Sequence, residues 1–264
     1  MYKKGGIDMG KVIAYINEKG GVGKSSVCFN VAWELALQEK KILMIDMDGQ
    51  RANLTYICGI EKEEGMLTLY DVLSGGVDCK RAVLIVEDNL HIIPASADVA
   101  SLDRENSSLE DMKKVIAEMK RYYDYIFIDV SPTPNRGHAL ALAAADGVII
   151  PMLPDITSLE ANMGVIESIK LTQKEINPTL RVLGVVFNKY TWRTVLSSKV
   201  TDTASKMAAA LNSKVFSAKI RNAVNLSENV GSHTGITTYA PKSKSADDIR
   251  KLCKEIEEVV HHDK

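Results

Sequence analysis

The chain has 264 residues, of which 45% are hydrophobic and 25% are charged, the composition of an ordinary soluble globular protein. This length is sufficient for a full hydrophobic core, so we expect a single domain over residues 10–264 behind a loose leader at 1–9. No apolar run approaches the roughly 20 residues of a membrane span, and the first residues lack the apolar core of a signal peptide. These features favour a cytoplasmic protein.

The spacing of the four cysteines limits the metal sites that are possible, and the charge distribution bears on the binding partners. Cys28, Cys58, Cys79 and Cys253 lie far apart without a C-x-x-C pair, which indicates buried reduced thiols and neither a zinc nor an iron–sulfur site. The net charge of −1 hides an asymmetry, because residues 181–264 contain 14 Lys and Arg against 8 Asp and Glu. The last third can therefore carry a basic face, although a mixed solvated surface is the alternative.

Short runs rich in Val and Ile, bounded by turn residues, predict strands at 11–17, 41–46, 90–94, 123–130, 147–152 and 181–188. Several of these runs are apolar almost throughout, which is typical of parallel strands covered on both faces. The segments between them predict helices at 25–39, 109–121, 139–145, 158–175, 195–211 and 246–260. Strands and helices that alternate in this way predict an α/β fold, a doubly wound and mostly parallel sheet with helices on both faces.

The first predicted strand runs into the sequence NEKGGVGKSS, directly ahead of a helix. Ligands of a doubly wound sheet bind beyond the carboxyl ends of its strands. Glycines at 20, 21 and 23 allow successive backbone N–H groups to converge on phosphate oxygens, aided by the helix N-terminus. Lys24 would place its ammonium on the β- and γ-phosphates, and the Ser25 hydroxyl would bind Mg²⁺. The loop therefore predicts a nucleotide site.

This loop departs from the usual pattern G-x-x-x-x-G-K-[ST], because Glu18 stands six residues before Lys24. The stretch KGGVGKS instead resembles the deviant Walker A motif K-G-G-x-G-K-[ST] of the ParA/MinD family of P-loop ATPases. The resemblance implies that Lys19 reaches across a nucleotide-sandwich dimer to the partner's phosphates, where a second cation offsets the repulsion between two triphosphates. It also implies that ATP with Mg²⁺ is bound by Gly20, Gly21, Val22, Gly23, Lys24, Ser25 and Ser26.

Two further stretches supply carboxylates for which the resemblance implies roles. ILMIDMDGQRANLT resembles the family's D-x-D-x-Q-x-N stretch, which places Asp48 where it orients or deprotonates the attacking water. YDYIFIDV has the form of a Walker B strand whose carboxylate, Asp129, holds Mg²⁺ or its water. Without the resemblance, a solvated turn after a strand is the alternative for Asp46 and Asp48. Ser131 replaces the first proline of the family's D-x-P-P.

The C-terminal third resembles the family's base-binding segments. GVVFNKYTWRT places Asn188 at the adenine-contacting position, and an amide suits a purine edge because it both donates and accepts; a simple cap at a strand end is the alternative. TYAPKSKSA resembles Y-x-P-x-S-x-G-A, a segment near the base, and would bring Pro241 there. Ser245 stands where glycine is usual. In VFSAKIRN, Ile220 replaces the proline of V-F-x-x-x-I-P-R-N.

The C-terminal segment, residues 245–264, distinguishes between two branches of the family. Ile249, Leu252, Ile256 and Val259 form an apolar stripe, whereas the other face mixes acidic and basic residues. This pattern predicts a closing helix packed on the sheet rather than the basic amphipathic anchor of membrane-cycling relatives. We therefore expect no membrane partner.

The remaining branch partitions DNA, either plasmid or chromosome. The resemblance implies an ATP-bound homodimer that holds non-specific DNA in the nucleoid and is released by hydrolysis, with a centromere-binding, ParB-like protein as the stimulating partner. Basic side chains spaced along loops suit phosphate contacts that do not read sequence. The candidates are Lys189, Arg193, Lys199, Lys219 and Arg221.

Several alternatives remain at this stage. Surface ion pairs are the alternative for Arg193 and Arg221. A related ATPase that positions a protein cargo would use the same dimer switch, and a MinD-like regulator would use it at a membrane. A small-molecule kinase or ligase is disfavoured, because no second substrate motif is present and Lys19 has no obvious use in a monomeric enzyme.

Overall fold

The structure is a computed structural model that describes residues 10–49, 53–61, 63–99, 108–192 and 195–261. The leader expected at 1–9 and the candidate Arg193 lie outside these residues.

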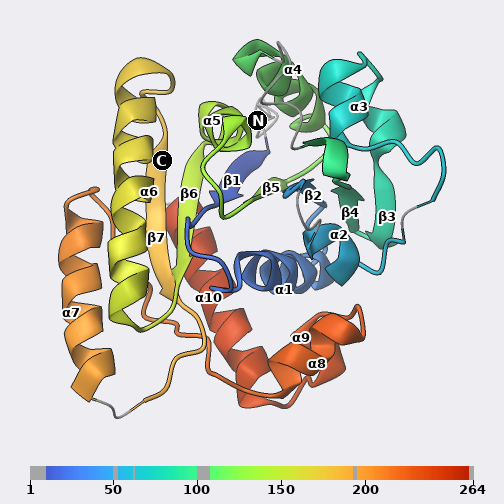
Figure 1. Cartoon of the computed structure of the whole chain (residues 1–264). Coiled ribbons are helices and arrows are strands. Elements are labelled where there is room, and N and C mark those ends of the chain that lie inside the picture. The colour runs from blue at the N-terminus through green and yellow to red at the C-terminus, as the bar shows by residue number, and fades with distance from the viewer. Residues whose placement is uncertain (1–9, 50–52, 62, 100–107, 193–194, 262–264) are drawn as a thin grey trace, which may run out of the picture.

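A central sheet runs through the molecule (Figure 1). Within the described residues its order is β3-β4-β2-β5-β1-β6-β7, with every pair parallel except β3 and β4. This confirms the predicted mostly parallel sheet and adds an antiparallel edge strand, β3, that the sequence analysis did not select. The strands are β1 (Lys11–Tyr15), β2 (Ile42–Met47), β3 (Leu84–Glu87), β4 (Leu90–Ile93), β5 (Tyr125–Val130), β6 (Gly147–Met152) and β7 (Arg181–Phe187).

Helices cover both faces of the sheet, and all six predicted helices are present. Four of them begin earlier than expected, and a polar side chain caps two of these: Asn135 accepts from the His138 N–H, and Asp155 accepts from the Ser158 N–H. Short helices escaped the periodicity analysis. The helices are α1 (Lys24–Leu37), α2 (Asn53–Ile57), α3 (Leu69–Ser74), η1 (Cys79–Ala82), α4 (Leu109–Met119), α5 (Arg136–Ala144), α6 (Ile156–Glu175), α7 (Val195–Ala209), α8 (Asn225–Gly231), α9 (Ile236–Tyr239) and α10 (Lys244–His261).

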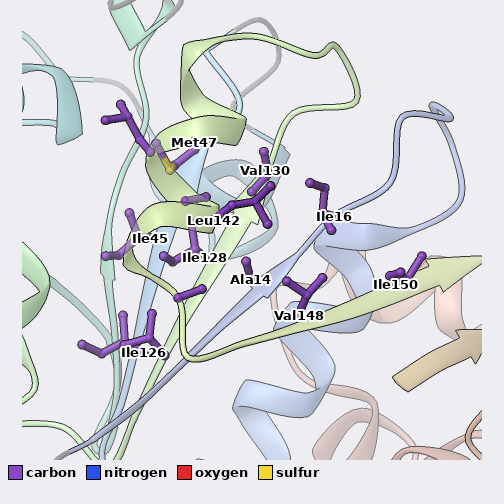
Figure 2. Close-up of a cluster of buried hydrophobic side chains, with 14 of the residues drawn as sticks. Ala14, Ile16, Ile45, Met47, Ile126, Ile128, Val130, Leu142, Val148 and Ile150 are labelled. Atoms are coloured by element: carbon purple, nitrogen blue, oxygen red, sulfur yellow. The ribbon is translucent and has the colours of Figure 1, made fainter. Parts of the chain in front are cut away.

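Alternate side chains of the strands feed two separate hydrophobic clusters. In β1, Val12 and Ala14 face the cluster on the α4, α5 and α6 side, part of which is shown in Figure 2. Ile13 and Tyr15 face the opposite cluster, which contains residues of α1 and α10. The apolar stripe of the tail belongs to this second cluster, so α10 closes the sheet as the sequence indicates.

The cysteines agree with the sequence-based expectation, since all four are free and buried. None of the helices that the structure describes combines the length and the apolar character needed to span a membrane.

Packing between β7 and the following segment leaves no room for a side chain at Gly184. A Cβ there would lie 2.5 Å from Cζ of the buried Phe216. We expect Gly184→Ala to lower the free energy of unfolding by about 1–3 kcal/mol, measured by urea denaturation. Gly231→Ala is the matched control, because its Cβ would meet no atom within 4 Å. A Gly184 variant as stable as the control variant would contradict this packing argument.

Candidate nucleotide-binding site

The register of the central strands places three polar side chains side by side. Asp129 of β5 pairs with Tyr15 of β1 on one side and with Asp46 of β2 on the other. The loop after β1 begins at this same edge of the sheet, as expected for a ligand site beyond the carboxyl ends of parallel strands. The predicted phosphate loop and both predicted carboxylate segments therefore meet in space.

The phosphate loop uses its glycines for backbone geometry. Gly21 and Gly23 have φ angles of 76° and 86°, in the left-handed region that favours glycine. Gly23 caps α1, so that the helix begins at Lys24. A Cβ at Gly23 would also collide with the Asn188 amide nitrogen. Sequence and structure thus agree on a tight loop that aims backbone N–H groups at the start of a helix.

A cavity of about 810 Å³ opens beside this loop. Its volume is in the range of small-molecule and cofactor sites. Loop residues, the carboxylate of Asp48 and two residues that follow β5 form its wall. The lining residues are Gly20, Gly21, Gly23, Lys24, Ser25, Ser26, Asp48, Asn53, Tyr56, Ile57, Pro132, Thr133 and Val230.

Lys24 and Ser25 reach back toward the buried carboxylates. Lys24 is only 7% exposed. Burial lowers the pKa of its ammonium, whereas the negative charges of Asp129 and Asp48 raise it. The Ser25 side chain opposes the rise in the Asp129 pKa, as a neighbouring hydroxyl does. An ammonium held between carboxylates at the base of a phosphate cavity is suited to neutralise phosphate charge.

Asp129 is fully enclosed rather than at an exposed strand end, and β5 continues through Val130. Burial, assisted by the charge of Asp46, raises the Asp129 pKa to about 8. Its Oδ1 atom is buried without a hydrogen-bond partner in the described part of the chain. Oxygen ligands are what Mg²⁺ requires, so the Asp129 carboxylate and the Ser25 hydroxyl fit a magnesium site.

The two aspartates of the D-x-D stretch are both buried, so the solvated-turn alternative is wrong. Asp46 accepts hydrogen bonds from the Asp48 N–H at 2.9 Å, the Thr55 N–H at 2.8 Å and the Thr55 hydroxyl at 2.7 Å. Burial nevertheless raises the Asp46 pKa to about 6. Asp46 thus joins β2 to α2, which no short motif in the sequence indicated.

Asp48 lies on the wall of the phosphate cavity, where a water-orienting carboxylate would have to be. The Asn53 amide lies 3.3 Å from Asp48 Oδ2 and donates to it. Asn53, the first residue of α2, is therefore a supporting residue that the sequence analysis did not select.

Lys19 points away from the cavity of its own subunit. It is not among the residues that line the cavity, and its ammonium lies 2.8 Å and 3.0 Å from the two carboxylate oxygens of Asp155, with the Thr157 hydroxyl also in contact. Asp155 is the N-cap of α6. The second lysine of the loop is therefore held by α6 and not by the residues around Lys24.

A second cavity of about 280 Å³ adjoins the first on the far side of Gly23. Asn188 lines it, and its amide donates to the Val22 carbonyl at 2.8 Å and accepts from the Lys189 N–H at 2.9 Å. An amide has two donors and two acceptor sites, so one of each remains for a ligand. The lining residues are Gly23, Ser26, Val27, Asn30, Asn188, Lys189, Ile220, Arg221, Asn222, Ala223, Leu226, Ser227, Val230 and Ile249.

Pro241 was placed near the base by the sequence analysis, but it lines neither of these two cavities. It is exposed, and its carbonyl accepts from Arg250 of α10. The segment from Ile220 to Val230 occupies the wall instead. The signal for this segment in the sequence is weak and consists of the likeness of its first residues to V-F-x-x-x-I-P-R-N.

The candidate DNA contacts are not equivalent. Lys189 and Lys199 are exposed. Lys219 lies over the Tyr190 ring, 4.3 Å from its centroid, and is only partly exposed. Arg221 forms a two-pronged ion pair with Asp248, at 2.6 Å and 2.8 Å, and its side chain is 26% exposed.

Arg221 also lies 5.0 Å from the centre of the Trp192 ring. The guanidinium therefore already contacts a carboxylate and an aromatic face, and its role as a DNA contact stays a prediction. The surface ion pair, the alternative at this position, is what the structure contains.

Two departures from the family pattern have physical reasons. The Ile220 N–H donates to the Phe187 carbonyl of β7, a bond that proline could not make. Ser245 is buried at the start of α10, and its hydroxyl donates to the Asn225 side chain of α8. Both residues attach the C-terminal segment to its neighbours.

Comparisons with known proteins agree with this geometry. A family model described as an AAA domain matches residues 10–182. The chromosome-partitioning ATPase Soj of Treponema pallidum is 33% identical over 94% of this chain and 97% of its own. Among solved structures, a McdA–ATP complex from Cyanothece superposes with a TM-score of 0.84 at 20% identity, covering 96% of each chain. MinD of Pyrococcus horikoshii with Mg-ADP gives 0.78 at 24% identity, covering 96% of this chain and 98% of MinD.

The fold and the phosphate loop define a P-loop ATPase. More narrowly, the chain belongs to the ParA/Soj/MinD family.

The enclosed carboxylate predicts a pH-dependent stability. A buried acid whose pKa is raised from about 4 in the unfolded chain to about 8 destabilises the fold progressively as pH rises between those values. We therefore expect Asp129→Asn to be more stable than wild type without nucleotide, by about 1 kcal/mol or more near pH 8, with the difference shrinking toward pH 5. Urea denaturation of both proteins measures it, with the exposed Asp202→Asn as control. A difference independent of pH would contradict the assignment.

Proposed function

We propose that this chain is an ATP-dependent dimerising switch that serves DNA partition, holding non-specific DNA as an ATP-bound dimer and releasing it on hydrolysis. The position of Lys19 carries the proposal. Its ammonium lies outside the phosphate cavity of its own subunit, so a use in trans accounts for its presence in the loop. The similarity to Soj over nearly the whole chain supports the partition role.

The nucleotide would lie across both cavities, with its phosphates at the loop and its base beside Asn188. Ser25 and Asp129 would hold Mg²⁺, which when bound supplies positive charge to the phosphate oxygens. Lys24 would neutralise the terminal phosphates, since its ammonium is already drawn to this edge by carboxylates. Asp48, on the cavity wall with its carboxylate supported by Asn53, would orient the attacking water.

Dimer closure would require Lys19 to exchange Asp155 for the partner's phosphates. Exposed ion pairs of this type contribute only about 0.2–1 kcal/mol, so two triphosphate charges are sufficient to displace it. The closed dimer would then present the exposed lysines of both copies to DNA. Contacts that are modest in one copy become firm attachment in two, because the second set binds at high effective concentration.

Hydrolysis would end this state, and a centromere-binding, ParB-like protein would set its timing. These partners follow from the likeness to the partition ATPases.

The restraint on Lys19 can be tested by Asp155→Asn. Asparagine preserves the cap of α6 but removes the charge that holds the lysine. We expect the ATP-dependent dimer to form at about two- to fivefold lower protein concentration, the equivalent of about 0.4–1 kcal/mol. Sedimentation velocity with and without ATP measures this, and Asp247→Asn in the first turn of α10 is the matched control. Equal dimerisation of the Asp155 variant and wild type would count against the restraint.

DNA binding tests the proposed function as a whole. We expect purified protein to bind a non-specific duplex with ATP but not with ADP or without nucleotide, and to lose affinity by more than about tenfold between about 50 and 200 mM salt. Lys19→Ala should abolish binding, and Lys199→Glu should weaken it while leaving ATP binding intact. Lys114→Glu, an exposed lysine of α4, is the control.

Fluorescence anisotropy of a labelled duplex provides the measurement. No binding with any nucleotide, in protein that still binds ATP, would overturn the partition role and direct attention to protein cargo.

A further inference from the structure

The loop that follows β5 is closed by its own side chain–backbone hydrogen bonds. The Ser131 hydroxyl donates to the Thr133 carbonyl at 3.1 Å and accepts from the Thr133 N–H at 3.3 Å. Ser131 is 1% exposed whereas Thr133 is exposed, so these bonds are partly shielded from water. This is the residue that replaces the first proline of the family pattern, and its hydroxyl restricts the backbone that proline would have restricted through its ring.

His138 of α5 forms a hydrogen bond with the same residue, Ser131. Nε2 of His138 lies 2.7 Å from the Ser131 carbonyl oxygen. A carbonyl only accepts, so Nε2 is the protonated nitrogen of the ring. Burial lowers the His138 pKa, which keeps the ring neutral and the other nitrogen, Nδ1, unprotonated.

Nδ1 of His138 has no hydrogen-bond partner among the described residues, although it is buried. An unsatisfied buried nitrogen costs free energy, so an apolar side chain would serve better if the position only filled space. The hydrogen bond of Nε2 to the loop is the compensating contact. It reaches a backbone position two residues after Asp129.

The loop is part of the phosphate cavity. Pro132 and Thr133 form its wall together with Gly20, Gly21 and Asp48, and none of these five residues lines the cavity beside Asn188. If the base lies beside Asn188, the loop faces the end of the nucleotide that carries the terminal phosphate. A shift of this loop would therefore alter hydrolysis of ATP more than binding of ADP.

We propose that His138 is a positioning residue for ATP hydrolysis: through the Ser131 carbonyl it fixes the loop at 131–133 against the terminal phosphate. Ser131 and His138 together replace the rigidity of a second proline. The inference rests on the proposed orientation of the nucleotide. It assigns a role to a histidine that none of the sequence motifs includes.

The test replaces His138 by two amide side chains of different length, glutamine and asparagine. Glutamine places its N–H₂ group near the position of His138 Nε2, whereas asparagine is too short to reach the Ser131 carbonyl. We expect His138→Asn to lower the kcat of ATP hydrolysis by about tenfold or more, with the Kd for ADP within about twofold of wild type. His138→Gln should retain a kcat within about threefold of wild type. Adding Ser131→Pro to His138→Asn should restore most of the lost kcat.

These readouts separate the inference from the proposed function. A wild-type protein that does not hydrolyse ATP removes the proposed function, whatever the variants do. With an active wild type, an unchanged kcat in His138→Asn would overturn the positioning role. Equal losses of kcat and ADP affinity would show that His138 acts only in packing, which would also overturn the positioning role. If His138→Asn does not fold, His138→Gln decides: wild-type kcat supports the role and a tenfold loss refutes it.

Discussion

The structure depends on one electrostatic constraint, the enclosure of Asp129 and Asp46 side by side at the carboxyl ends of two adjacent strands. Water is excluded from both, so a negative charge on either side chain is costly unless cations or hydrogen bonds from the loops above balance it. Lys24 and Ser25 face Asp129, while Thr55 and the Asp48 N–H satisfy Asp46. Each loop of the site is thereby attached to the sheet through a carboxylate. A bound cation would relieve the same cost, which links nucleotide binding to the fold.

The two lysines of the phosphate loop, Lys19 and Lys24, have different electrostatic partners. Lys24 is drawn inward by the enclosed carboxylates, whereas Lys19 is held outward by the cap of α6. The first interaction is shielded and the second is partly exposed, with 24% of the Lys19 side chain accessible, so salt and competing anions weaken only the second substantially. This difference suits a loop that keeps its own phosphates while it releases one cation toward a partner.

Part of the C-terminal third lines the cavity beside Asn188. Arg221 connects the wall of the cavity beside Asn188 to α10 through Asp248, and Ile220 connects it to β7. A ligand in that cavity would touch residues that also fix the last helix. The excess of positive charge in this third is therefore partly consumed within the fold, and Lys189 and Lys199 are the candidates that remain exposed among the described residues.

Local patterns were sufficient for six of the seven described strands, for the six longest described helices and for the phosphate loop, because periodicity, glycine geometry and caps act within a few residues. They could not show that Asp46 contacts Thr55, that Lys19 is held by Asp155 across 136 positions, or that His138 supports the Ser131 carbonyl. The ion pair of Arg221 with Asp248 and the position of Pro241 outside both cavities were hidden for the same reason. Which side chains meet, and whether a charge is free or paired, depends on the packing of segments distant in the chain, and it became visible only when the sheet brought those segments together.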